Sequence, residues 1–342
     1  MRMKKLLVLF VSICLVSVLA MMPSVGICAP TKPKVIILGT HEIGSGGYNL
    51  LSLVTESMVK KYPEIKWRSI PSGVDLGRTM MVRTGETATT IHSAGAVWMI
   101  QEGLFKYASI EWGPQPAREI YCPEHVGMGF AVRGDSEVKT GYDLRGKTVA
   151  IYPGSPYPTL INQSILAFFG LTWKDVVPVK YSSPGEAYRA IRDKHLDTAF
   201  MNSASSVAVE MASMPCGIRW LDMPADNKEG WKRVQAVVPV HMPKKKTWGP
   251  GITKEHPVTF LGVAYPDIIA YDHTDEATVY WITRALIETH SDWEKKNRSL
   301  KEDWTLEKHW KLWDGGITPM HRGAIRYYKE IGQWTPEREK MN

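Results

Sequence analysis

Residues 34–48 have the sequence Lys34-Val35-Ile36-Ile37-Leu38-Gly39-Thr40-His41-Glu42-Ile43-Gly44-Ser45-Gly46-Gly47-Tyr48. The apolar start predicts a short buried strand over 34–38, and the apolar stripe after the turn predicts a helix over Tyr48–Tyr62. Glycines let the backbone turn tightly and aim several N–H groups at one point, and a helix N-terminus adds unpaired donors. The stretch therefore predicts an anion-binding turn, with a tight connection that binds no ligand as the alternative.

Three known motifs are absent from this turn. A P-loop requires Lys and then Ser or Thr straight after its second glycine, but Ser45 and Gly46 follow Gly44. The dinucleotide pattern G-x-G-x-x-G is not met in register. His41-Glu42 begins like the zinc motif H-E-x-x-H, but Ser45 stands where the second histidine is required. These comparisons exclude a nucleotide site and this zinc site, so the turn is still predicted to bind an anion.

Strands and helices alternate on both sides of residue 130. After the first helix, Ile65–Ile70 is an expected strand and Asp75–Arg83 an expected helix, which is the rhythm of a parallel α/β sheet. The second unit has expected strands at 129–133, 148–152, 176–181 and 197–201, and helices at 158–169 and 184–194. Further strands at 258–265 and 268–271 precede a helix at 275–290.

The fold class predicted from this rhythm is a two-lobed α/β protein with a ligand cleft between its lobes, because about 310 residues exceed one comfortable core. Crossing segments are expected near residues 132 and 240. They assign residues 33–131 and 241–342, with the C-terminal helices, to lobe I and residues 132–240 to lobe II.

The second unit repeats the geometry of the first turn. Pro153-Gly154-Ser155 lies between an expected strand and an expected helix, so a second helix N-terminus would face the cleft. Asn202 and Ser203 follow the strand at 197–201, and ligands of open α/β sheets collect at such carboxyl ends. Helix capping is the equally good alternative for Asn202 and Ser203.

The N-terminus predicts export to the periplasm. Arg2, Lys4 and Lys5 precede an apolar run over 6–22, which is typical of a secretory signal, here assigned to residues 1–29 with its cleavage point open. An uncleaved anchor is the alternative. Lipid attachment at Cys28 is disfavoured because the bulky Ile27 precedes it.

Composition predicts a globular protein with no affinity for nucleic acid. Hydrophobic residues make up 44% and charged residues 23% of the chain. The net charge of +7 includes three basic residues of the first 29, so 39 basic against 35 acidic residues remain, a balance of +4. This balance is too even to argue for nucleic-acid binding.

Cysteines, lysines and tryptophans give three further expectations. Cys14 and Cys28 lie in the signal, which leaves Cys122 and Cys216 either as a disulfide or as free thiols. Lys244–Lys246 is expected to be a solvated loop. The tryptophans of the C-terminal region are expected in amphipathic helices that cover a lobe rather than in a ligand cage; they are Trp293, Trp304, Trp310 and Trp313.

The sequence predicts no enzyme. The elbow G-x-S-x-G is absent, and Gly44-Ser45-Gly46 is its nearest imitation. The ten histidines show no usable metal-ligand spacing. We therefore expect no catalytic residue, no metal and no cofactor, although enzymes can use a two-lobed fold.

Six segments resemble the TAXI-type solute-binding proteins of TRAP transporters, in the same order from about Val35 to Gly332. The glycine turn and the C-terminal Gly-Ala-x-Arg-Tyr-Tyr stretch are the diagnostic ones, whereas Leu-Arg-Gly-Lys is shared with many periplasmic receptors. The segments are Gly39–Tyr48, Arg78–Glu86, Val132–Ser136, Asp143–Lys147, Pro153–Ser155 and His321–Glu330.

The resemblance implies a type II periplasmic-binding-protein fold that closes on its solute and delivers it to a membrane permease driven by an ion gradient. Characterised relatives bind glutamate, related amino acids or 2-oxoacids, so a small carboxylate or amino acid is the expected solute. A sensor that feeds a membrane kinase is the alternative function. The expected ligand contacts are Ser45, Gly46, Gly47, Tyr48, Ser93, Gly154, Ser155, Asn202 and Ser203.

The first turn departs from the family, which is usually small and neutral where this chain has His41, Glu42 and Ile43. A glutamate inside an anion-binding turn would repel a carboxylate, and burying it unpaired costs several kcal/mol. We therefore expect Glu42 to point outward; contact with a ligand amine, a cation or His41 is the alternative.

Overall fold

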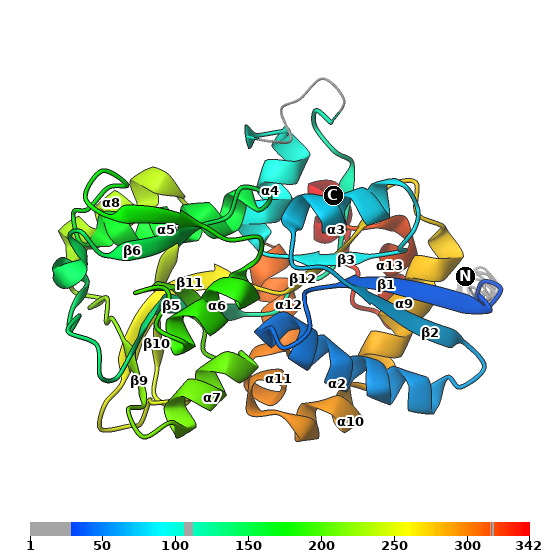
Figure 1. The fold of residues 1–342 in the computed structure, drawn as a ribbon. Coiled ribbons are helices and arrows are strands. Elements are labelled where there is room, and N and C mark those ends of the chain that lie inside the picture. The colour runs from blue at the N-terminus through cyan, green and yellow to red at the C-terminus, as the bar shows by residue number, and fades with distance from the viewer. Residues whose placement is uncertain (1–28, 106–111, 315, 317) are drawn as a thin grey trace, which may run out of the picture. The chain divides into compact units, whose positions relative to one another are not determined.

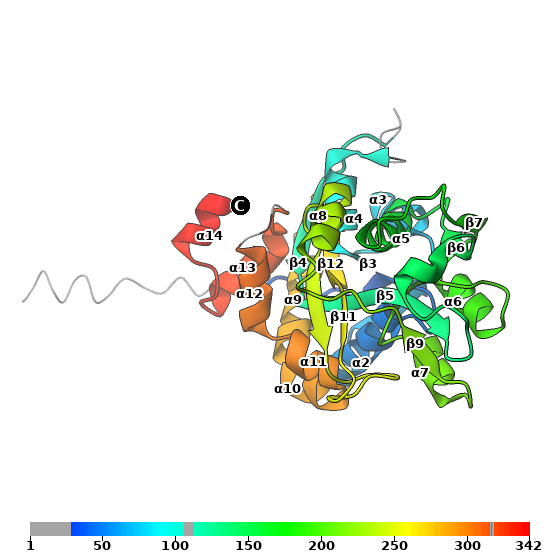
Figure 2. The ribbon, with the colours of Figure 1, turned by 90° about the vertical axis from the view of Figure 1, so that its left-hand side faces the viewer.

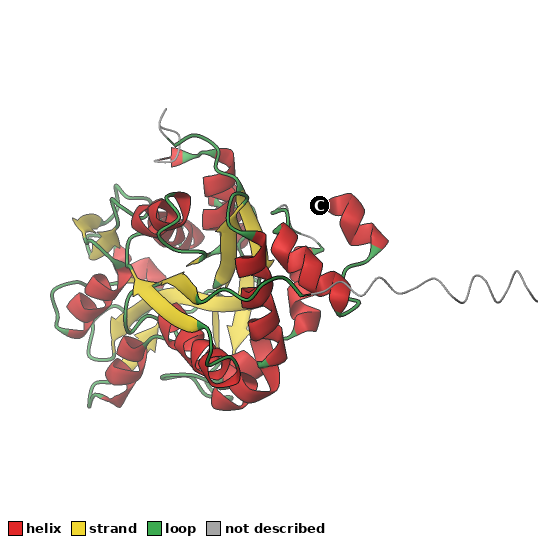
Figure 3. Cartoon of the chain, turned by 90° about the vertical axis from the view of Figure 1, so that its right-hand side faces the viewer, coloured by secondary structure: helices red, strands yellow, loops and turns green. Residues whose placement is uncertain are grey.

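Two groups of strands organise the protein in the computed structural model, which describes residues 29–105, 112–314, 316 and 318–342. The predicted signal lies outside the described residues except for Ala29. Residues 32–342 form one compact unit, in which helices surround the strands (Figure 3). No helix among the described residues is both long and apolar enough to span a membrane.

Sheet I contains the first strand of the chain. β1 and β2 pair in parallel, and a bridge from Leu38 to Thr89 joins β1 to the segment before β3. β12 returns late in the chain and pairs antiparallel with β3 and β4. The strands of sheet I are β1 (Val35–Thr40), β2 (Lys66–Pro71), β3 (Thr90–His92), β4 (Ala117–Tyr121) and β12 (Asp267–Tyr271).

Sheet II is built around β5, which pairs antiparallel with β8, β9 and β11 (Figure 1). β6 and β7 pair in parallel, and a bridge from Val149 to Thr198 joins β6 to the segment before β8. The strands of sheet II are β5 (His125–Arg133), β6 (Thr148–Ile151), β7 (Val177–Lys180), β8 (Ala199–Asn202), β9 (Ile218–Trp220), β10 (Met242–Lys246) and β11 (Val258–Ala264).

The chain changes sheets twice, between β4 and β5 at 122–124 and between β11 and β12 at 265–266. These positions differ from the crossing segments expected near 132 and 240, because β10 and β11 remain in the sheet of β5. We call residues 32–121 and 267–342 half I, and residues 125–264 half II. The assignment of lobes as 33–131 with 241–342 and as 132–240 stays a prediction.

The predicted helices form, with ends shifted by a few residues. The first begins at Gly46 rather than at Tyr48, because the Ser45 hydroxyl accepts a hydrogen bond from the Tyr48 N–H at 3.2 Å and caps the helix. The helices that flank the two sheets are α2 (Gly46–Lys61), α3 (Asp75–Arg83), α4 (Ala94–Glu102), α5 (Pro156–Phe168), α6 (Pro184–Arg192), α7 (Ser206–Ser213), α8 (Lys228–Val237) and α9 (Glu276–Glu288).

The prediction of a solvated loop at Lys244–Lys246 is wrong. These residues end β10, which pairs with β11, and Lys246 is only 7% exposed. The Lys246 ammonium lies 4.3 Å from the centre of the Trp248 ring, and desolvation lowers the pKa of this lysine. A lysine stem can cover apolar surface, which a count of charges along the sequence does not detect.

The C-terminal tryptophans cover half I, as predicted. Trp293 and Trp304 are fully buried, and Trp310 packs its ring against Tyr328 at 4.8 Å between centres. The Tyr328 hydroxyl donates to the Ile120 carbonyl at 3.0 Å, which ties these helices to β4. Figure 2 shows them together on one flank; they are α10 (His290–Trp293), α11 (Arg298–Asp303), α12 (Leu306–Trp313), α13 (Arg322–Glu330) and α14 (Pro336–Met341).

Cys122 and Cys216 are both free thiols, so the structure contains no disulfide between them. Cys122 is buried beside His309, with 3.5 Å between its Sγ and the ring Nδ1. Burial raises the pKa of the Cys122 thiol and lowers the pKa of His309 to about 3, so both groups are neutral and the thiol is unreactive.

Two buried carboxyl groups lie on neighbouring strands of sheet I. Glu119 of β4 and Asp267 of β12 are 3% and 1% exposed. Burial raises the pKa of Glu119 to about 8, and burial together with the charge of Glu119 raises the pKa of Asp267. The folded protein therefore holds a proton here that the unfolded chain releases at acidic pH.

This retained proton makes stability depend on pH. The contribution of Glu119 is complete below its unfolded pKa near 4.3 and is lost as the pH rises towards about 8. We expect Glu119→Gln, relative to the wild type, to gain about 3–4 kcal/mol between pH 5 and pH 8 in urea unfolding. The exposed Glu86→Gln is the control, and parallel pH profiles of wild type and Glu119→Gln would contradict the prediction.

Candidate functional site

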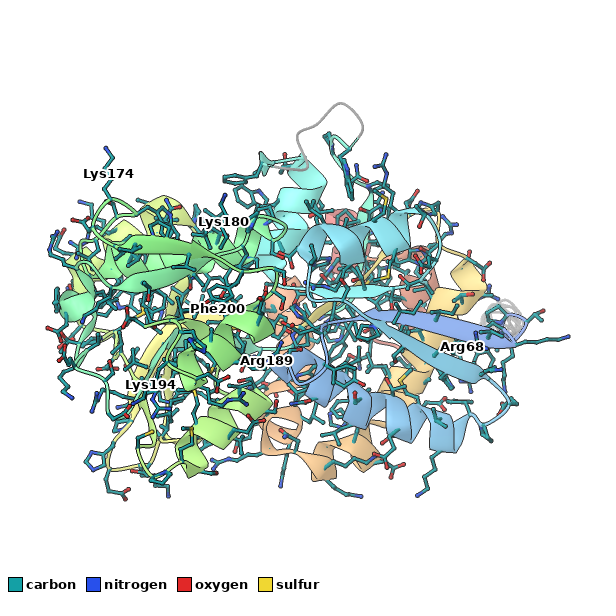
Figure 4. The ribbon with its side chains drawn as sticks, in the orientation of Figure 1. Arg68, Lys174, Lys180, Arg189, Lys194 and Phe200 are labelled. Carbon is teal, nitrogen blue, oxygen red and sulfur yellow. The ribbon has the colours of Figure 1, made fainter. Side chains whose placement is uncertain are left out.

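A small cavity lies where half I and half II meet. It leaves about 30 Å³ for the centres of water molecules, which is room for one or two. Three of its four aromatic rings come from half II, where Figure 4 shows Phe200, and the fourth, Tyr265, lies between β11 and β12. The aromatic lining residues are Tyr157, Tyr188, Phe200 and Tyr265. The polar lining residues are His41, Glu42, Ser45, Asp75, Arg78, Ser93 and Asn202.

The N-terminus of α2 enters this cavity from half I. Ser45 is its N-cap, and the Tyr265 side chain packs against Gly47. Gly46 and Gly47 are in the first turn, where helix geometry offers N–H groups no acceptor within the helix. A Cβ on Gly47 would lie 2.1 Å from the Tyr265 hydroxyl, so this position requires glycine.

Asn202 faces the first turn of α2 from the end of β8. Its Oδ1 accepts a hydrogen bond from the Ala204 N–H at 2.8 Å, which fixes the orientation of the side chain. Its Nδ2 is buried and has no hydrogen-bond partner among the described residues. A Cβ on Gly46 would lie 2.9 Å from this nitrogen, so the absence of a side chain lets the two halves approach. The unpartnered Nδ2 of Asn202 thus lies next to the N-terminus of α2.

A buried ion pair between Asp75 and Arg78 lines the cavity. Arg78 is 1% exposed and Asp75 is 3% exposed, and their side chains are hydrogen-bonded to each other. Arg78 also donates to the Ile91 carbonyl at 3.2 Å and to the Ser72 carbonyl at 2.8 Å. Burial raises the pKa of Asp75, and the guanidinium of Arg78 opposes this rise.

Two histidines lie close to this ion pair as neutral groups. Desolvation lowers the pKa of His41 and of His92, and the positive charge of Arg78 lowers both further. The His92 Nε2 is 3.2 Å from the Thr79 hydroxyl. The buried Nδ1 of His41 has no partner within the described part of the chain, so it is a second polar atom available to a solute.

Glu42 points across the cleft, and the expectation that it points outward is wrong. Its carboxylate accepts hydrogen bonds from the Ser183 hydroxyl at 2.7 Å and from the Gly185 N–H at 2.6 Å. Both donors belong to the N-terminus of α6 in half II. The carboxylate is stabilised there because a helix N-terminus carries unpaired N–H groups and partial positive charge.

Ser45, Ser93 and Asn202 are the predicted contacts that line the cavity. Gly46 and Gly47 are buried in the adjoining turn, and the N–H of the half-buried Tyr48 is taken by Ser45.

The other predicted contacts lie away from the lining. The Ser155 hydroxyl accepts from the Asp75 N–H at 3.0 Å, and the Gly154 carbonyl accepts from the Leu76 N–H at 3.3 Å. They therefore join half II to α3 of half I. Ser203 is buried beside Asn202, outside the lining residues.

We call the aromatic lining residues Tyr157, Tyr188, Phe200 and Tyr265 the aromatic wall. The sequence did not identify the ion pair or the aromatic wall as parts of a site. Asp75 and Arg78 stand three residues apart at a helix start, a spacing that surface pairs share. Tyr157, Tyr188 and Tyr265 have the pattern of ordinary core residues. No group of three potential metal ligands occurs among the described residues.

Removing Arg78 should destabilise the protein strongly. Arg78→Met would leave Asp75 buried without its partner, and we expect a loss of about 3–5 kcal/mol in chemical unfolding. Arg68→Met is the matched control, because Arg68 is exposed on β2 at the outer edge of half I (Figure 4). The double variant Asp75→Asn/Arg78→Met should recover part of the loss. Equal stability of Arg78→Met and Arg68→Met would contradict the role of the pair.

Three solved structures resemble this chain in fold. The periplasmic binding protein BugD is 12% identical, with 90% of this chain and 98% of that chain covered and a TM-score of 0.58. A periplasmic transporter structure is 14% identical, with 91% and 96% covered and a TM-score of 0.54. The alkanesulfonate-binding protein SsuA from Xanthomonas axonopodis pv. citri is 13% identical, with 90% and 86% covered and a TM-score of 0.52.

No curated protein matches the sequence. The NMT1-like family matches residues 75–332, which is most of the chain. The order of the strands, the two halves and the similar structures agree on one architecture. The chain belongs to the NMT1-like family and has the α/β fold of the type II periplasmic binding proteins.

Proposed function

We propose that this protein is an exported solute-binding receptor of a membrane transporter. One observation carries the proposal: His41 of half I and Asn202 of half II both line one small cavity, and each has a buried nitrogen, Nδ1 and Nδ2, without a hydrogen-bond partner among the described residues. Buried polar atoms are normally paired, so a solute that bridges these two atoms would complete the site. The similar structures named as binding proteins support the same function.

The solute that fits this arrangement is a small carboxylate or an amino acid. A carboxylate between the Gly46 N–H and the Asn202 amide would receive two donors and the partial charge of α2. The aromatic rings of half II and of Tyr265 would enclose its apolar part. The residues proposed to contact it first are Ser45, Gly46, Ser93 and Asn202; Gly154 and Ser155 would act by closing the halves.

Binding would require no chemical step. The Ser45 hydroxyl is occupied in capping α2, and the neutral His41 lies against the ring of Tyr265, with 5.6 Å between ring centres. A nucleophile needs a base within hydrogen-bond reach, and Ser45 bonds to backbone instead. The receptor would capture its solute by closing the two halves over it.

The proposed route is that of a TAXI-type TRAP transporter. Export by the N-terminal signal would place the receptor in the periplasm, where it would deliver its solute to a permease driven by an ion gradient. The motifs of residues 39–48 and 321–330 support this finer assignment. The second motif forms α13, where a Cβ on Gly323 would lie 2.4 Å from the Glu276 carbonyl oxygen, so it packs α13 against α9.

A cognate solute should raise the melting temperature of the purified protein. At a hundredfold excess over the dissociation constant, binding stabilises the folded state by about 2.7 kcal/mol. A panel of amino acids, 2-oxoacids and other small acids, followed by calorimetry on each that shifts the melting temperature, would identify it. If none shifts it and the protein turns over an ester, the receptor function fails.

Asn202→Asp should then reduce affinity for that solute at least tenfold. The aspartate keeps an acceptor for the Ala204 N–H but replaces the free donor by a negatively charged oxygen, and a hydrogen bond to a charged group contributes about 1.5–3 kcal/mol. Ser203→Ala is the matched control, because Ser203 is a buried neighbour outside the cavity lining. Calorimetric titration of both variants measures the difference. The same affinity in wild type and Asn202→Asp would refute the proposed contact.

A further inference from the structure

The carboxylate of Glu42 fits closely against two glycines and two hydrogen-bond donors. A Cβ on Gly185 would lie 2.7 Å from the Glu42 carboxylate, and a Cβ on Gly73 would lie 3.0 Å from it. The donors are the Gly185 N–H and the Ser183 hydroxyl. We call this group, formed by Gly73, Ser183 and Gly185, the anion seat.

In the anion seat, an N–H group at the start of α6 finds a hydrogen-bond acceptor. The first N–H groups of a nine-residue helix have no acceptor within the helix, and the Ser183 hydroxyl caps only the Glu186 N–H, at 3.3 Å. Gly185 therefore takes its acceptor from outside the helix. That acceptor comes from residue 42, which is 143 residues away in the sequence and belongs to half I.

We propose that Glu42 occupies, on half II, the place that a solute carboxylate would take. The protein then closes without solute, and the site selects a solute with one carboxylate over one with two. This proposal rests on the proposed receptor function for its second part only. Glu42 is in this sense a specificity-determining residue that also holds the halves together.

Neighbouring contacts show that this bond is part of a closed arrangement. The Gly44 carbonyl accepts hydrogen bonds from the Ser206 N–H at 3.1 Å and from the Ser206 hydroxyl at 2.9 Å. Both bonds run from the first turn of half I to the N-terminus of α7 in half II. Glu42 and Gly44 thus tie the same turn to two helices of the other half.

The charges around the cavity favour the same selection. Among its lining residues are two acidic side chains, Glu42 and Asp75, and one arginine, Arg78, which is already paired with Asp75. A solute with a second carboxylate would have to displace Glu42 from the anion seat or lie near it unpaired. Like charges in a site with little water repel strongly, so affinity for such a solute falls.

The first experiment needs no solute. Small-angle X-ray scattering would compare the ligand-free wild type with Glu42→Ala, which empties the anion seat, and with Glu42→Gln, which keeps the shape of the side chain. The exposed Glu86→Ala is the control. We expect a larger radius of gyration for Glu42→Ala, a smaller increase for Glu42→Gln and none for Glu86→Ala. The same radius for wild type and Glu42→Ala would overturn the proposal.

The second experiment uses glutamine and glutamate, which have the same length and differ by one carboxylate. Calorimetric titration should show that the wild type prefers glutamine at least tenfold, and that Glu42→Ala loses or reverses this preference. The same ratio in both proteins would overturn the selective role of Glu42. If neither amino acid binds any variant, the proposal that Glu42 selects between them is refuted. The proposal that Glu42 closes the halves without solute is then tested by the scattering experiment alone. The receptor function itself fails only if the wider panel of acids also fails.

Discussion

The buried ion pair between Asp75 and Arg78 is the constraint around which the two halves are arranged. A charge without water needs a partner and further hydrogen bonds, and Arg78 of this pair finds them at the carbonyls of Ile91 in β3 and of Ser72 in the loop before α3. The Asp75 N–H reaches the Ser155 hydroxyl in half II. Moving the halves apart therefore removes a hydrogen bond at the base of this ion pair, and the closed arrangement has a defined geometry.

Polar groups of both halves line the cavity between them. The Asn202 amide has a fixed orientation and a donor without a partner among the described residues, while each oxygen of the Glu42 carboxylate already accepts a hydrogen bond. One end of the cavity can thus receive a negative charge, whereas the other already holds one. The same physical rule, that buried polar atoms require partners, leads to both proposals.

Many of the strands and helices, and the tight turn before the first helix, could be predicted from the sequence, because apolar periodicity and glycine position act locally. Asn202 was expected from its place at a strand end, and Ser45 and Ser93 from their places in the family motifs; all three line the cavity. The orientation of Glu42 could not be found this way, since its partners Ser183 and Gly185 lie far along the chain. Lys246 and the aromatic wall were missed because burial of such side chains depends on which segments pack together.

The cavity volume described above bears on the speed of exchange. Space for one or two water molecules cannot admit an amino acid, so a solute can enter only while the halves are apart. The apparent affinity then equals the intrinsic affinity multiplied by the fraction of molecules that are open. Capture would become slower as self-closure strengthens, and an empty receptor would differ little in outline from a loaded one. A permease that serves it would need a cue other than closure to tell the two apart.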